Sequence, residues 1–144
     1  MTTVHDVAAY VLRARGPLTA MKLQKLVYYS QAWSLAVNGR PLFPERVRAW
    51  ANGPVVYELF DRHRRQFVVS HWEGDPEALA PSDRPLIDRV VATYGVLSGD
   101  RLSELTHAEV PWREARAGIP VGSPSSREIS HVVMRTFFST QRPP

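Results

Sequence analysis

Histidine supplies the side chains in this sequence that are best suited to acid–base or metal chemistry, and there are five of them. No two have the spacing of HExxH or of a ligand pair one helical turn apart, which zinc-binding helices use. The run His-Ala-Glu at 107–109 matches part of the zinc-deaminase signature, but that signature also needs two cysteines and the chain has none. Packing or helix-capping roles are therefore expected for His5, His63, His71, His107 and His131.

Other patterns that carry chemistry are also missing. A Gly-Pro pair at 53–54 could present backbone donors to an anion at a helix start, but proline removes one donor, so a structural turn is favoured. No serine lies in a G-x-S-x-G nucleophile elbow. Glu58 and Asp61 have the spacing of ordinary charges on a helix surface. We therefore expect no catalytic residue, no metal site and no cofactor, and we expect that the chain is not an enzyme.

Composition sets the broad class. The chain has 144 residues, of which 44% are hydrophobic, and this suits one compact domain, predicted over residues 1–140 with a frayed tail at 141–144. The absence of cysteine fits a reducing cytosol. The N-terminal residues have no signal-peptide pattern, and no apolar run approaches the ~18 residues that a membrane span needs. We expect a cytoplasmic protein with no membrane partner.

The positive charge is unevenly distributed. The formal net charge is +4, and residues 1–60 carry 7 basic and 3 acidic groups, whereas residues 61–144 carry 11 of each. An acidic protein or a nucleic acid would be attracted to such a surface, although a small net charge also serves solubility alone. The basic run at 62–65 lies near the expected end of a helix, where cations complement the helix dipole or contact an acidic partner.

The elements that must position these residues are mostly helical. Thr3 with Asp6 predicts the cap of a first helix, and Gly16-Pro17 ends it. Thr19 predicts the cap of a second helix over residues 20–37, which is apolar on nearly all sides and therefore central. Asn38-Gly39 closes that helix, because both residues tolerate left-handed backbone.

The remaining pattern alternates short strands and helices. Residues 47–51 and 67–72 predict two strands that pair, and a third helix between them begins with Pro54 at its first position. Further helices are predicted after the caps Ser82, Ser98 and Ser125, with a short one from Pro111. The expected fold class is mainly α (α+β), a compact helical domain of about six helices with a small two-stranded β element.

A DNA-binding interpretation also fits the first two helices. The segment 7–33 has the helix, Gly-x-Leu-Thr turn and second helix of winged helix-turn-helix proteins. Lys22, Gln24 and Lys25 would lie near the start of the second helix, where a recognition helix contacts bases. The apolar remainder of that helix counts against this interpretation.

Three blocks of sequence resemble Panacea-domain proteins, which act as antitoxins in bacterial and phage toxin–antitoxin pairs. The first block is LQKLVYY at 23–29, followed by GRPLF at 39–43. The second is AWANGPVVY at 49–57, and the third is LSELTH at 102–107 with Pro-Trp at 111–112. The resemblance extends over residues 4–138. The positions that carry it most specifically are Gly53, Pro54, Val55, Leu26, Tyr28, His107 and Trp112.

This resemblance implies neutralisation of a co-encoded protein toxin by direct binding, with no catalytic residues. Some relatives act as adaptors that deliver the toxin to a cellular protease, and this alternative stays open here. Others carry an additional DNA-binding domain, for which this chain has no room. A DNA-binding regulator of the winged-helix type remains a further alternative.

The residues expected to bind the toxin are aromatic or basic, because Tyr, Trp and Arg are frequent interface hot spots. They are Tyr29, Trp50, Tyr57, Arg62, Arg64 and Arg65. For Trp50 and Tyr57, packing against the Gly-Pro turn is the competing structural role.

Overall fold

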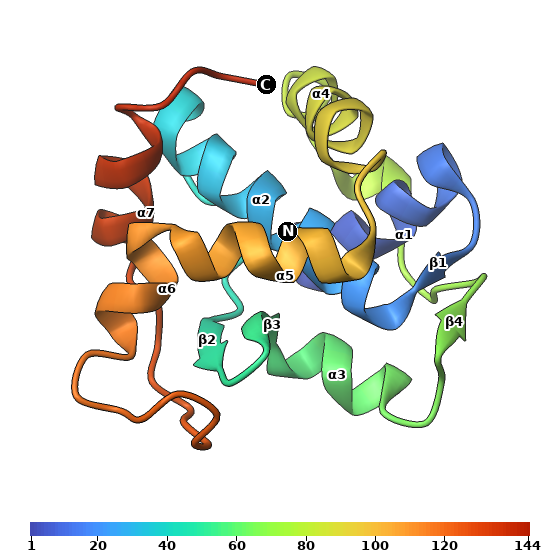
Figure 1. The fold of residues 1–144 in the computed structure, drawn as a ribbon. Helices are drawn as coiled ribbons and strands as arrows, with labels where there is room; N and C mark the ends of the chain where they lie inside the picture. The colour runs from blue at the N-terminus through green and yellow to red at the C-terminus, as the bar shows by residue number, and fades with distance from the viewer.

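The computed structural model describes residues 1–144 and contains seven α-helices, two small sheets and a short 3-10 helix (Figure 1). The helices are α1 Val4–Arg15, α2 Ala20–Asn38, α3 Tyr57–His63, α4 Arg84–Tyr94, α5 Gly99–Ala108, α6 Val110–Ala115 and α7 His131–Phe138. The strands are β1 Leu18–Thr19, β2 Val47–Trp50, β3 Gly53–Val56 and β4 Val68–Val69, and the 3-10 helix η1 is Pro76–Ala78. The expected fold class, mainly α with a small β part, is confirmed.

Local capping explains where the first helices begin and end. The backbone N–H of Thr3 donates to Asp6 Oδ2 at 2.9 Å, which stabilises the start of α1. The hydroxyls of Thr19 and Ser98 accept hydrogen bonds of 3.2 and 3.1 Å from backbone N–H groups three residues further on. Gly39 ends α2 in a left-handed conformation, with φ of 72°. These ends agree with the sequence predictions.

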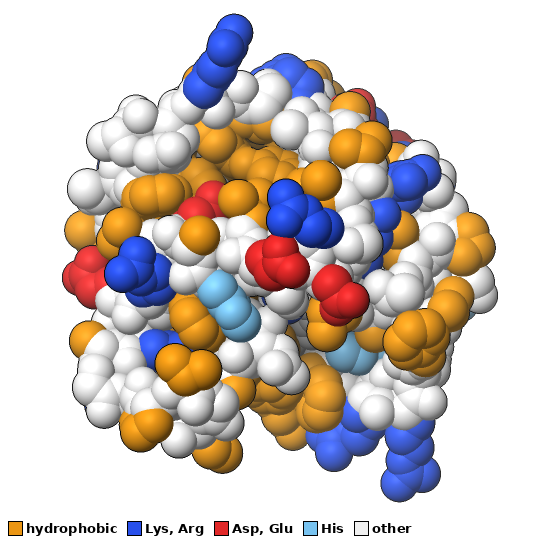
Figure 2. All heavy atoms as spheres, in the orientation of Figure 1, with side chains coloured by type: hydrophobic (Ala, Val, Ile, Leu, Met, Phe, Trp, Pro, Cys, Tyr) orange, Lys and Arg blue, Asp and Glu red, His pale blue; other side chains and the backbone are white.

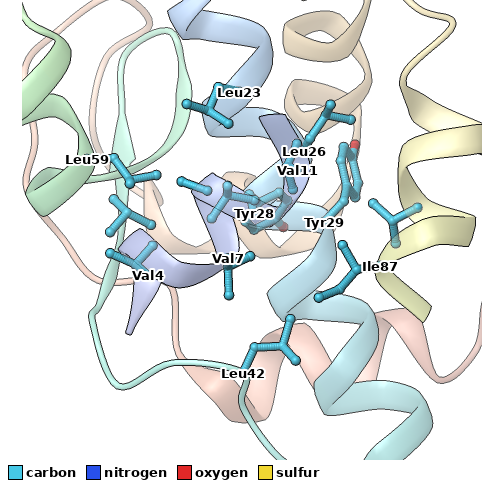
Figure 3. Close-up of a cluster of buried hydrophobic side chains, with 14 of the residues drawn as sticks. Val4, Val7, Val11, Leu23, Leu26, Tyr28, Tyr29, Leu42, Leu59 and Ile87 are labelled. Carbon is cyan, nitrogen blue, oxygen red and sulfur yellow. The ribbon is translucent and has the colours of Figure 1, made fainter. Parts of the chain in front are cut away.

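Helix α2 forms the centre of the molecule, and α1, α4, α5, α7 and β3 pack around it (Figure 1). Its side chains Tyr28, Tyr29 and Trp33 are fully buried. Figure 3 shows Tyr28 and Tyr29 among apolar side chains from α1, α3 and α4. Because every side of α2 meets another element, its apolar residues leave no solvent-facing stripe, as its sequence predicts.

The predicted pairing of the two strands is wrong. Strand β2 pairs antiparallel with β3, and β4 pairs with β1, so residues 47–50 and 68–69 belong to different sheets. The cause is the turn at Gly53, whose φ of +125° reverses the chain. Pro54 then lies in a strand opposite Ala49 rather than at the first position of a helix, and α3 begins only at Tyr57.

Two later helices begin further along the chain than predicted. The N-cap of α4 is Asp83 rather than Ser82. Helix α7 begins after Ser130, whose hydroxyl accepts a 3.1 Å hydrogen bond from a backbone N–H, and not after Ser125. The intervening residues are extended because the Ile129 backbone N–H donates to the Val47 carbonyl at 2.8 Å. The buried face of α7 consequently consists of Met134 and Phe138, whereas Val132 is 72% exposed. No helix in the chain has the length and apolarity to cross a membrane.

Candidate functional site

The β2–β3 hairpin is held from two sides by segments that are distant in the sequence. From α2, Gln24 Oε1 accepts from the Val56 backbone N–H at 2.9 Å, and its Nε2 donates to the Val56 carbonyl at 3.1 Å. From α6, Trp112 Nε1 donates to the Trp50 carbonyl at 2.8 Å. The two strand ends are therefore fixed to the core, and the residues that they carry occupy a defined position.

The turn of this hairpin requires glycine. A Cβ on Gly53 would lie 2.7 Å from Lys25 Cε, closer than non-bonded carbon atoms approach, and the φ of +125° is rare for L side chains. Lys25 passes beneath the turn, and its Nζ donates to the Pro54 carbonyl at 3.3 Å. Val55, the next residue of β3, is buried. The Gly-Pro-Val block therefore forms a turn built over a lysine side chain.

His107 and Trp112 support the hairpin from the opposite side. Their rings stack with centroids 4.0 Å apart and an angle of 14° between planes. Burial lowers the pKa of His107 below its usual value, so its ring is neutral at pH 7. Behind Trp112, the buried Arg116 donates to the carbonyls of Ala49 and Ser123 at 2.9 and 2.6 Å. Leu26 and Tyr28, the other positions of the shared blocks, lie in the core beneath.

An aromatic cluster lies on the outer side of the hairpin and α3. The Trp50 and Phe60 rings pack edge to face with centroids 4.9 Å apart, and Tyr57 lies 6.4 Å from Trp50 and 6.2 Å from Phe60. Tyr57 is 46% exposed, and the other two rings are partly exposed. Aromatic area of this kind on a fixed backbone offers large contacts at a small cost in side-chain entropy.

Arg64 borders the aromatic cluster, and Arg62 and Arg65 are its neighbours in the sequence, with Arg62 Nη1 donating to the Glu73 carbonyl at 2.9 Å. The Arg64 guanidinium lies 5.2 Å from the Phe60 ring centroid and donates to Asp61 Oδ1 at 2.7 Å, while Arg62 and Arg65 are exposed. Figure 2 shows blue basic side chains beside orange hydrophobic ones at the lower edge of the molecule, over β3 and α3. We call this region the hairpin–α3 surface, and define it as Trp50, Tyr57, Phe60, Arg62, Arg64 and Arg65.

Tyr29 does not belong to this surface, and the expectation that it contacts a partner is corrected. Its exposed fraction is 0%, its ring stacks on Tyr94 at 4.0 Å, and its hydroxyl donates to Glu109 Oε1 at 2.7 Å. A ring enclosed by the core has no surface to offer a partner. Burial raises the pKa of the Glu109 carboxyl from 4.5 to about 7, so this hydrogen-bonded pair sits in a poorly solvated place.

A pocket of about 550 Å³ opens beside the hairpin–α3 surface. Trp50 and Phe60 are shared by the pocket and the surface, while Gln24, Lys25 and His63 also line it. The complete lining is Met21, Gln24, Lys25, Trp50, Ala51, Asn52, Val55, Phe60, His63, Pro124, Ser125 and Ser126. We call it the Lys25 pocket. Its position makes it continuous with the exposed aromatic cluster.

Lys25 is an unusual residue because it is 2% exposed yet ionisable. Burial lowers the pKa of its ammonium from 10.5 to about 8, so the group still carries most of its charge at pH 7. Gln24 is equally buried beneath the hairpin, where its amide also lies 2.9 Å from His63 Nε2. The DNA-binding interpretation is wrong for these two residues, because side chains enclosed under the hairpin cannot contact bases.

Comparison with known proteins assigns the chain to a protein family. Residues 23–113 match the family described as "Antitoxin SocA-like, Panacea domain". The chain belongs to this Panacea-domain family. The matched range contains all three blocks that carry the resemblance in the sequence, although it is shorter than the range 4–138 expected from them.

A curated relative of this Panacea-domain chain is Antitoxin SocA of Caulobacter vibrioides (strain NA1000 / CB15N). The alignment has a length of 114 residues with 30% identity, and it covers 67% of this chain and 58% of the relative. The chain thus spans less than two thirds of the relative's length. No solved structure matches the chain.

Two residues of the candidate site, Phe60 and Lys25, were not predicted as such from the sequence. Phe60 was not among the residues expected to bind a partner, but it is partly exposed and packs against Trp50 and Tyr57. The burial of Lys25 could have been predicted from the sequence, since a lysine in a helix that is apolar on nearly all sides must itself be enclosed. The burial of Glu109 could not have been predicted in this way, because it depends on Tyr29, which is distant in the sequence.

Proposed function

We propose that this protein is an antitoxin that neutralises a co-encoded protein toxin by direct binding through the hairpin–α3 surface. Family membership supports the antitoxin role. The observation that carries the choice of surface is the cluster of Trp50 on the hairpin with Tyr57 and Phe60 on α3, three at least partly exposed aromatic rings beside a hairpin fixed by core hydrogen bonds.

Physical chemistry favours this surface over the rest of the molecule. Aromatic and arginine side chains dominate binding free energy at protein interfaces, and here they adjoin each other. The hairpin keeps its backbone hydrogen bonds without a partner, so little ordering is needed on binding. Arg62, Arg64 and Arg65 favour an acidic area on the toxin, since opposite charges raise the association rate and select the partner.

The experiment is co-expression of this chain with the gene beside it in the genome. Growth and pull-down are scored together. Rescue of growth with a stable complex supports the proposal. A harmless neighbour, or a toxic one that is neither bound nor rescued, contradicts it.

Two variants locate the binding surface. Tyr57→Ala and Arg65→Glu change exposed side chains, so they should leave the fold intact and each weaken binding by about tenfold or more. Arg89→Glu on α4 is the matched control for the charge reversal, because Arg89 is exposed on a helix distant from α3 (Figure 1). Equal weakening by Arg65→Glu and Arg89→Glu would assign the effect to overall charge and not to this surface.

The adaptor alternative predicts a different result. If the chain delivers toxin to a protease, toxin abundance falls on co-expression, and rescue disappears in a strain that lacks the protease. Neutralisation by binding alone leaves toxin abundance unchanged. We expect the second result, because the proposed contact needs only the two proteins.

A further inference from the structure

The Lys25 pocket combines an enclosed cation with an opening onto the proposed interface. The Lys25 side chain is buried, and the only hydrogen bond of its Nζ is the 3.3 Å contact with the Pro54 carbonyl. An ammonium group has three N–H donors, so two of them lack a protein acceptor. No aspartate or glutamate lines the pocket, and no carboxylate lies within ion-pair distance of Lys25. The cation therefore has no counter-charge within the chain.

The surrounding backbone is shaped to accommodate this lysine. A Cβ on Gly53 would lie 2.7 Å from Lys25 Cε and 3.2 Å from Lys25 Nζ. It would also lie 3.2 Å from Thr106 Oγ1, so only glycine leaves room for the lysine side chain here. An apolar side chain of the same length would avoid the unfavourable burial of a charge. A charge that is buried, unpaired and accommodated by a specific glycine indicates that its counter-charge comes from outside the chain.

The pocket's size and position indicate the source of that charge. Its volume of about 550 Å³ accommodates an amino-acid side chain with room for its backbone. Trp50 and Phe60 belong to both its wall and the hairpin–α3 surface, so a protein seated on that surface covers the pocket mouth. Arg62, Arg64 and Arg65 outnumber Glu58 and Asp61 in this part of the chain, so the adjoining rim has a net positive charge that favours an acidic segment.

We propose that the Lys25 pocket receives an aspartate or glutamate side chain of the toxin, whose carboxylate pairs with the Lys25 ammonium at the centre of the complex. This inference rests on the proposed function and specifies the chemistry of its interface. Trp50 and Phe60 flank the aliphatic part of the incoming side chain and exclude water. The resulting charge-assisted hydrogen bond is stronger than a neutral one, because it forms in a poorly solvated place.

The test is the affinity of the purified toxin for Lys25→Met and Lys25→Gln variants, measured by calorimetry. Methionine keeps the side chain out to the ε position and removes the charged amine, while glutamine is uncharged but keeps an N–H donor for the Pro54 carbonyl. Truncating one member of a buried ion pair is expected to weaken binding about 30-fold or more in both variants. Lys22→Met removes the same charge from a partly exposed position on α2 and should weaken binding less than threefold. Thermal unfolding of each variant checks that the fold is retained.

The acidic partner residue is found by changing each surface Asp and Glu of the toxin to its amide. One such change should weaken binding to the wild-type chain and have no further effect on Lys25→Met, as expected when both changes remove one interaction. If folded Lys25→Met and Lys25→Gln bind the toxin with wild-type affinity, the inference is overturned. Loss of toxin binding in Tyr57→Ala would in that case leave the proposed function standing. If no variant and no wild-type chain binds the toxin, the proposed function fails as well. Micromolar binding of succinate to the wild-type chain that persists in the toxin complex would assign the pocket to a free carboxylate and also overturn the inference.

Discussion

Replacing Lys25 with methionine should stabilise the folded chain at neutral pH, although it removes a hydrogen bond. Burial lowers the pKa of Lys25 from 10.5 to about 8. At about 1.4 kcal/mol for each tenfold change in proton affinity, this lowering corresponds to about 3 kcal/mol of destabilisation while the group stays protonated. The lost hydrogen bond to the Pro54 carbonyl offsets about 1 kcal/mol. The expected net gain in the free energy of unfolding is therefore about 2 kcal/mol, which raises Tm by roughly 4–8 °C.

The gain should depend on pH with a defined sign. Below pH 8, Lys25 is protonated in both the folded and the unfolded chain, so the full destabilisation is present. Between pH 8 and 10.5 the folded chain loses the proton while the unfolded chain keeps it, so wild-type stability rises with pH. The advantage of Lys25→Met should consequently fall to near zero at pH 10. The buried Tyr28 and Tyr29 and the partly buried Tyr94, whose pKa values are raised, affect both proteins alike and cancel in the difference.

Urea unfolding of the two proteins at pH 7 and pH 10 measures this difference directly. Lys22→Met is the control, because Lys22 is partly exposed and its replacement should change stability by less than about 0.5 kcal/mol. A destabilised Lys25→Met at pH 7, or an equal gain at both pH values, would refute the reasoning that an unpaired buried charge is held in this pocket.

Three further outcomes are expected. As pH rises from 4.5 through about 7, the wild type should lose up to about 3 kcal/mol of stability, because the buried Glu109 carboxyl ionises later in the folded chain than in the unfolded one. Glu109→Gln should not show this loss. Urea midpoints of both proteins across roughly pH 5–8 measure the difference. Gly53→Ala should destabilise by more than about 2 kcal/mol, because its Cβ meets the Lys25 side chain, whereas Gly118→Ala, also at positive φ but with open space around it, should cost only about 1 kcal/mol in the same thermal unfolding assay. Arg116→Met should cost about 3 kcal/mol in urea unfolding, because three backbone carbonyls lose their buried donor; a change below 1 kcal/mol would mean that water replaces it.

Local signals predicted those parts of the fold that local contacts determine. The caps at Thr3, Thr19 and Ser98 and the end of α2 at Gly39 depend on residues within one helical turn, so the sequence sufficed. The hairpin did not follow from such signals. Pro54 is as acceptable at the first turn of a helix as in a short edge strand, and only its pairing with Ala49 decides between them.

The site was predicted in part for the same reason. Trp50 and Tyr57 were expected as contact residues and lie on the hairpin–α3 surface, where their role in binding stays a prediction. Tyr29 was misplaced because aromatic type alone does not distinguish an interface ring from a core ring. Its burial is set by Tyr94 and Glu109, which come from segments more than sixty residues away.

The dependence of α2 on its last packing partner has a consequence for synthesis. The Trp33 ring packs edge to face with Phe138 at 5.1 Å, so the central helix is completed only by the C-terminal α7. The segment between Asn38 and His131 spans 93 residue positions, which a ribosome at ~5–20 residues per second translates in roughly 5–20 s. During that interval the most apolar helix of the nascent chain is only partly covered. We expect chains stalled before residue 131 to be cleaved within α2 by added protease, and chains of all 144 residues released from the ribosome to resist. Equal resistance of both would mean that α2 is protected without α7. The nascent chain would thus be most vulnerable to proteolysis and aggregation while it is still attached to the ribosome.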